Sequence, residues 1–138
     1  MIKLIIGKKG SGKTKKLIQL ANEAVAASSG NVVVVEKGAK LTYDVTHKAR
    51  LIDTDVYGIS GYNMLLGFIS GICAGNYDVT DIFVDSTFKI CEEGVDGLAP
   101  FVEKLNALSE EAQANITMLV SAAETDLPAD LKAEYVEI

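Results

Sequence analysis

The chain has 138 residues, which suits one domain with a sizeable core, and its 49% apolar and 23% charged residues exclude a disordered chain. Its net charge of −6 opposes binding to nucleic acid or to an anionic membrane, because like charges repel unless cations are concentrated locally. The densest group of lysines is short and lies near the N-terminus: Lys8, Lys9, Lys13, Lys15 and Lys16. We therefore expect neither a membrane nor nucleic acid as a partner.

The order of apolar runs predicts alternating strands and helices. Buried strands are expected at residues 2–6, 32–35, 82–84 and 116–120, with shorter candidates at 49–52 and 135–138. Helical spacing predicts helices over 14–27 and 98–112, and Ser60 is expected to cap a third over 61–73. Alternating strands and helices imply one α/β domain over 1–138, with a mostly parallel sheet of about five strands between helices on both faces.

No targeting or membrane segment is expected. Residues 1–4 lead directly into the first strand, so we predict no leader peptide. The longest mostly apolar run, 64–74, is shorter than the roughly 20 residues that span a bilayer. We expect a cytoplasmic protein in which Cys73 and Cys91 are buried free thiols.

A phosphate-binding motif follows the first strand and opens the first helix. The motif G-x-x-x-x-G-K-[ST] is matched at every fixed position. Glycines let the backbone wrap around phosphate oxygens, Lys13 is expected to contact the β and γ phosphates, and Thr14 to hold magnesium. The alternative is a glycine-rich turn with incidental lysines. The predicted nucleotide-binding residues are Gly7, Lys8, Lys9, Gly10, Ser11, Gly12, Lys13 and Thr14.

A second motif supplies a carboxylate for the same site. Residues 81–86 have the form of a Walker B strand, and Asp85 is expected to hold magnesium beside Thr14; the alternative is a carboxylate that caps the next turn. Many ATPases place a glutamate directly after this aspartate, but this chain has Ser86. Glu36, at the end of the second strand, is the best substitute for a catalytic base; the alternative is a solvated loop carboxylate. The absence of an Asn-Lys-x-Asp element, which reads guanine, favours ATP or a site that tolerates several bases.

These pieces resemble the RecA-like ATPases, which share a P-loop, a glutamate ending the next strand and a Walker B strand ending in Asp-Ser. The resemblance implies the three-layer αβα P-loop NTPase fold, a hydrolase with Mg-ATP, and Glu36 as the residue that orients the attacking water. It also implies that Ser121, after the strand at 116–120, could sense the γ-phosphate. Small bacterial P-loop proteins of this kind sometimes carry a twitching-motility ATPase label, but the additional domain and the arginine and histidine motifs of those motors are missing here.

Three functions remain open. An ATPase or ATP-dependent switch is the leading interpretation. A small nucleoside or nucleotide-type kinase is the alternative, although such enzymes clamp phosphoryl charge with several arginines and this chain has only Arg50. A regulatory ATP-binding module without turnover is the third, because Ser86 stands where many ATPases have a catalytic glutamate. Gly67, Gly71 and Gly75 form a smooth helical stripe, expected to pack on the sheet or to contact another copy of the chain, and an unidentified protein partner stays open. The role of residues 39–62 stays open.

Overall fold

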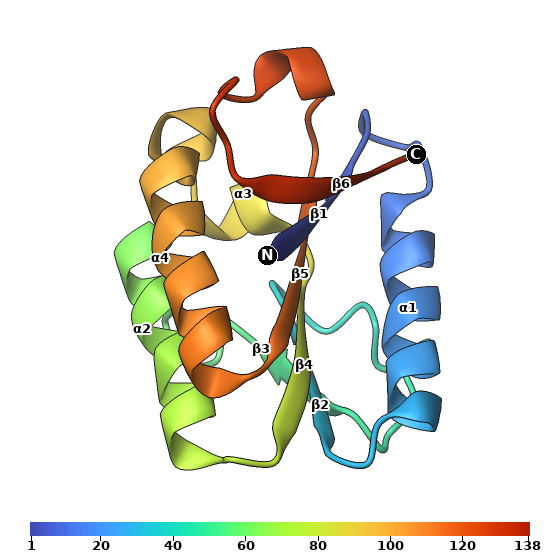
Figure 1. Cartoon of the computed structure of the whole chain (residues 1–138). Helices are drawn as coiled ribbons and strands as arrows, with labels where there is room; N and C mark the ends of the chain where they lie inside the picture. The colour runs from blue at the N-terminus through green and yellow to red at the C-terminus, as the bar shows by residue number, and fades with distance from the viewer.

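The computed structural model describes all residues from 1 to 138 and contains one open sheet of six parallel strands (Figure 1). The strand order is β3-β2-β4-β5-β1-β6, so the first strand lies inside the sheet. The fold is therefore α/β, as predicted, but with a sheet that is wholly parallel and one strand larger than expected. The strands are β1 (Ile2–Ile6), β2 (Asn31–Glu36), β3 (Arg50–Asp53), β4 (Val79–Val84), β5 (Asn115–Val120) and β6 (Ala133–Glu137).

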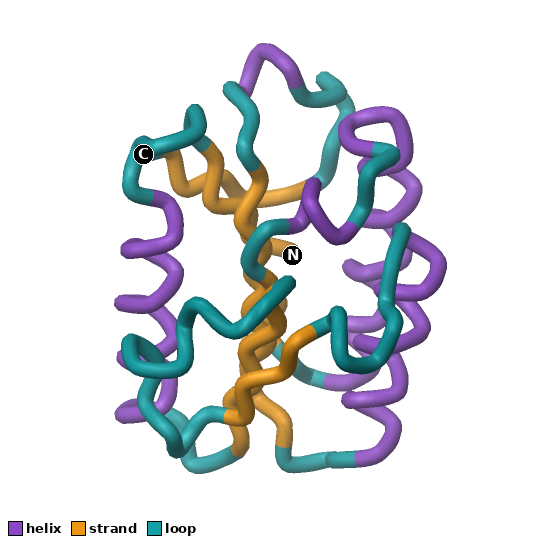
Figure 2. Tube along the Cα trace, turned by 180° about the vertical axis from the view of Figure 1, so that it is seen from behind, coloured by secondary structure: helices purple, strands orange, loops and turns teal.

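Helices cover both faces of this sheet (Figures 1 and 2). Helix α1 (Lys13–Ala27) lies on one face, and α2 (Tyr62–Gly75) and α4 (Leu98–Ala112) lie together on the other. The α1 side also receives Leu41, Val45 and Ala49 from the segment between β2 and β3. Because both faces are covered, the central strands are mostly apolar, as the four consecutive valines of β2 illustrate.

Helix α2 differs from the prediction at its start and in its packing. Its N-cap is Gly61, with a φ of 84°, and Ser60 makes no cap. The buried positions of α2 include Leu65 and Ile69, whereas Gly67 and Gly71 lie two residues further on, about 200° around the helix. A Cβ added at Gly67, Gly71 or Gly75 would meet no atom within 4 Å, so packing of this stripe on the sheet was a wrong prediction.

Two connections that were not predicted shape the edge of the sheet where the strands end. A four-residue helix, α3 (Thr87–Ile90), follows β4, and a 3₁₀ turn at Gly94–Gly97 leads into α4. A second 3₁₀ turn, Glu124–Asp126, precedes β6. The Ile138 amide then donates a hydrogen bond of 3.0 Å to the Ile6 carbonyl, which brings residue 138 beside the loop after β1 (Figure 1).

The remaining predictions about elements are confirmed within a few residues. The uncertain candidates at 49–52 and 135–138 are the strands β3 and β6. Cys73 and Cys91 are buried free thiols. Each of the two longest helices has 15 residues, and no helix in the structure is long and apolar enough to cross a bilayer.

Candidate functional site

Three neighbouring strands end at the same edge of the sheet, and each is followed by polar residues. The loop 7–12 follows β1, Asp85 and Ser86 follow β4, and Ser121 follows β5. The strand order places β4, β5 and β1 side by side. In open parallel sheets this edge is where ligands bind. The fold therefore brings together residues that lie more than 100 positions apart in the chain.

The glycines of the loop after β1 permit its shape. Gly10 and Gly12 have φ angles of 82° and 95°, a left-handed conformation that side-chain-bearing residues rarely adopt. A Cβ at Gly7 would approach Ser11 Oγ to 2.6 Å and the Ile138 carbonyl oxygen to 3.1 Å. The loop therefore needs glycine at 10 and 12 for conformation and at 7 for space.

The loop presents unbonded main-chain N–H groups at the start of α1. The amides of Lys9, Gly10, Gly12, Lys13 and Thr14 donate no hydrogen bond within the protein, and the first helical bond runs from Lys16 N to Gly12 O at 3.1 Å. The helix dipole adds partial positive charge at the same end. Such a set of neighbouring free donors at a helix N-terminus is suited to bind an anion, phosphate above all.

Lys13 is held under this loop. Its side chain is only 5% exposed, and its Nζ donates a hydrogen bond of 2.7 Å to the Lys8 carbonyl. Burial lowers the pKa of Lys13, and the nearby Asp85 carboxylate raises it in part. Lys13 Nζ also donates a longer hydrogen bond of 3.5 Å to Ser11 Oγ, so one of the three N–H donors of the ammonium stays free. Lys13 can therefore bind an oxyanion in the loop while staying anchored to it.

Thr14 and Asp85 form an oxygen pair beside the loop. Thr14 Oγ1 donates to Asp85 Oδ1 at 3.3 Å, and Ser86 Oγ donates to Asp85 Oδ2 at 2.7 Å. Asp85 is 7% exposed and is fixed by its own amide, which donates to the Val35 carbonyl. Magnesium prefers oxygen ligands and is commonly held by one carboxylate together with phosphate oxygens and water. This donor set suits magnesium, although no group of three metal-ligating side chains is present.

Glu36 lies at the same sheet edge but faces another segment. It is 1% exposed, and its two carboxylate oxygens accept hydrogen bonds from the Lys40 amide at 3.0 Å and the Leu41 amide at 3.3 Å. Burial raises the pKa of Glu36, with smaller contributions from Asp85 and Asp53, while the two amide bonds lower it. Each oxygen keeps a second lone pair, so Glu36 can still accept a hydrogen bond from water. It is buried, unlike the solvated loop carboxylate considered as an alternative.

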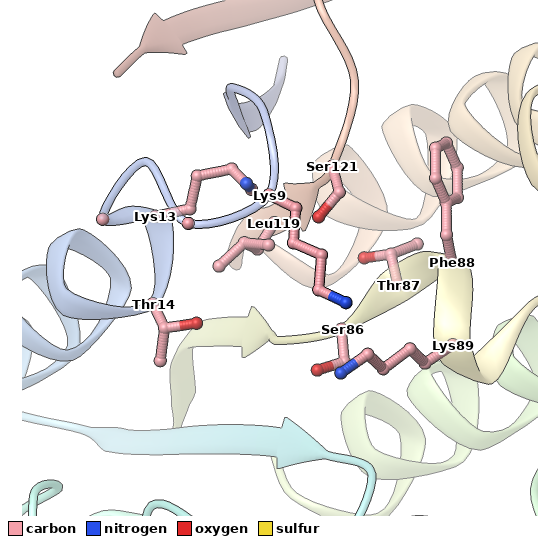
Figure 3. A pocket seen from close by; sticks show the side chains of 11 residues that line it. Lys9, Lys13, Thr14, Ser86, Thr87, Phe88, Lys89, Leu119 and Ser121 are labelled. Atoms are coloured by element: carbon pink, nitrogen blue, oxygen red, sulfur yellow. The ribbon is translucent and has the colours of Figure 1, made fainter.

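A cavity of about 410 Å³ opens between the loop and α3 (Figure 3). The predicted residues Lys13, Thr14 and Ser121 line it, whereas Glu36 does not. Four residues of the opposite wall, 86–89, and Leu119 were not predicted as site residues. The only sequence signal for residues 86–89 was their place directly after Asp85, and Leu119 is an apolar residue of β5. The lining residues are Lys9, Gly10, Gly12, Lys13, Thr14, Ser86, Thr87, Phe88, Lys89, Leu119 and Ser121.

The predicted nucleotide-binding residues divide into two groups. Lys9, Gly10 and Gly12 face the cavity together with Lys13 and Thr14. The others, Gly7, Lys8 and Ser11, belong to the same loop but do not line the cavity.

Comparison with protein-family models and with curated protein sequences gave no match. What the site can do must therefore be inferred from its own geometry.

Proposed function

We propose that this chain is a P-loop protein of the RecA-like kind that binds ATP with magnesium and hydrolyses it, either as an ATPase or as a switch. The observation that carries the proposal is the set of unbonded amides of Lys9, Gly10, Gly12, Lys13 and Thr14, which ends beside the Thr14–Asp85 oxygen pair. Phosphates and their metal ion require these two features next to each other.

Each residue has a specific role in this proposal. The loop amides and Lys13 would bind the β and γ phosphates, and their positive charge would stabilise negative charge that develops during phosphoryl transfer. Thr14 and Asp85 would hold magnesium, which neutralises phosphate charge when bound. Ser121 follows β5, lines the same cavity and would contact the γ-phosphate as its sensor.

Water activation is assigned to Glu36. Its raised pKa makes it a stronger base than an exposed glutamate. Both of its oxygens already accept amide hydrogen bonds from residues 40 and 41. Taking a proton from water would weaken those bonds, so hydrolysis would be coupled to the segment after β2. This coupling supports a switch as well as an ATPase.

Calorimetric titration with Mg-ATP tests the proposal. The wild type should bind one equivalent, and Lys13→Ala should abolish the binding. Lys15→Ala is the matched control, because Lys15 is an exposed lysine of the same helix and lines no part of the cavity. Equal binding by wild type and Lys13→Ala would contradict the proposal.

A phosphotransferase is the second candidate function. The observation that favours it is the pair of lysines, Lys9 and Lys89, on the cavity wall, because they can supply the charge that arginines supply in small kinases. Phosphorylation of a nucleoside, measured with a panel of nucleosides, would favour this candidate over hydrolysis. ATP consumption that no nucleoside increases would favour the ATPase.

A further inference from the structure

The cavity beside the loop has a second wall with its own chemistry. Residues 86–89 form this wall, and Ser121 lies between it and the loop (Figure 3). Ser86 has a φ of 56°, a left-handed turn that directs the chain from β4 into α3. The volume of about 410 Å³ is in the range of small-molecule sites, so the cavity has room for more than one terminal phosphate.

The charged residues that line the cavity are all cationic, although the Asp85 carboxylate lies next to it and accepts hydrogen bonds from Thr14 and Ser86. Three of the eleven lining residues are lysines and none is a carboxylate, in a chain with a net charge of −6. Lys13 is already bonded to the loop carbonyl of Lys8. Lys9 and Lys89 make no side-chain hydrogen bond, and the one ion pair of the protein lies elsewhere, between Lys37 and Asp55. Figure 3 draws the Lys9 and Lys89 ammonium groups on the side of Ser86, away from Lys13.

Thr87 provides an independent indication of a ligand. Its side chain is fully buried, and its hydroxyl has no hydrogen-bond partner. Thr87 nevertheless lines the cavity, and Figure 3 shows its hydroxyl directed toward Ser121. An unpaired buried hydroxyl destabilises a protein, and valine would fill the same space without that cost. A bound ligand that accepts a hydrogen bond from Thr87 would account for the threonine.

We propose that Lys9, Thr87 and Lys89 form a second oxyanion subsite, which binds the phosphate group of a small ligand other than the nucleotide and shares Ser121 with the γ-phosphate position. The inference rests on the proposed function only in placing the nucleotide phosphates on the 7–14 loop. Two ammonium groups and two hydroxyls suit a tetrahedral dianion, which accepts several charge-assisted hydrogen bonds at once. The ligand would therefore lie beside the terminal phosphate of the nucleotide.

Inorganic phosphate is the probe, titrated into protein saturated with Mg²⁺ and a non-hydrolysable ATP analogue. The loaded wild type should bind one phosphate, and Lys89→Met and Thr87→Val should each weaken this binding at least about tenfold, the scale of one charge-assisted hydrogen bond. Lys104→Met, an exposed lysine on α4, is the matched control and should bind phosphate as the wild type does. Thr87→Val should keep or raise the melting temperature, which separates ligand loss from unfolding.

Competition with nucleotides distinguishes the proposed subsite from the γ-phosphate position of the nucleotide. If phosphate binds beside ADP but is displaced by the ATP analogue, the site is that of the γ-phosphate and the proposal is overturned. Absence of phosphate binding to loaded protein, or unchanged binding by Thr87→Val and Lys89→Met, would also overturn it. If the analogue itself does not bind, the proposed function fails separately. Phosphate is then titrated into the Lys13→Ala variant without nucleotide. Binding that is retained there, and lost when Lys89→Met is added, supports the subsite. Absence of phosphate binding to the Lys13→Ala variant overturns it.

Discussion

Thr14 donates a hydrogen bond of 3.3 Å to Asp85, which joins the first turn of α1 to the end of β4 across 71 positions of the chain. The two residues are far apart in sequence, and the fold brings them together at the edge where the parallel strands end. Ser86 holds the other oxygen of the same carboxylate. The pair therefore has a fixed orientation toward the loop that begins at Gly7, as a magnesium site beside bound phosphates requires.

Asp85→Asn should remove the dependence of nucleotide affinity on magnesium. The amide keeps the size of the side chain but loses its charge, so magnesium should no longer improve ATP binding by ten-fold or more, which is about 1.4 kcal/mol. Calorimetry with Mg-ATP and with ATP plus a chelator measures the difference. Asp130→Asn, at an exposed aspartate, is the control. Full retention of the magnesium effect in Asp85→Asn would exclude Asp85 as a ligand.

Glu36→Gln should slow ATP hydrolysis by at least ~100-fold while Mg-ATP binding is retained, because a general base contributes on that scale. Steady-state phosphate release and calorimetry on the same preparation separate the two effects. The variant also loses one acceptor for the amides of Lys40 and Leu41, so its melting temperature must be recorded. A folded variant with wild-type turnover would remove Glu36 from the mechanism.

The stability of the protein should depend on pH through Glu36. Burial raises its folded-state pKa above the ordinary 4.5, so the native state binds this proton more tightly than the unfolded chain does. The contribution of Glu36 to stability is therefore complete below pH 4.5 and is lost as the pH rises through the folded pKa. Urea unfolding from pH 4 to 7 should show the wild type losing stability relative to Glu36→Gln. A difference between the two proteins that does not change with pH would refute the shift.

Two glycine-to-alanine changes should act in opposite directions. Gly12→Ala places a Cβ on a backbone with φ of 95° and should destabilise the fold by about 1–2 kcal/mol, as well as weaken ATP binding. Gly71→Ala lies in the middle of α2 with open space around it and should stabilise by about 0.5–1 kcal/mol. Urea unfolding measures both. A destabilised Gly71→Ala would indicate that the glycine stripe contacts a second copy of the chain.

The loop after β1 and Asp85 could be predicted from the sequence because each depends on a short local pattern. Gly7 to Thr14 is a contiguous motif, and Asp85 follows a strand whose end the sheet fixes. Thr87 and Lys89 were missed because α3 has only four residues, too few to show helical periodicity. The bonds from Lys40 and Leu41 to Glu36 were also missed, because the irregular segment after β2 contains no pattern that gives its path.

Titration of the wild type with Mg-ATP, followed by both heat and melting temperature, tests the central claim most directly. Binding only to the folded state at a ligand concentration of 100 times Kd stabilises a protein by about 2.7 kcal/mol, which is readily seen as a higher melting temperature. We predict one site, a raised melting temperature, and loss of both signals in Lys13→Ala but not in Lys15→Ala. No heat and no thermal shift in the folded wild type would contradict the account.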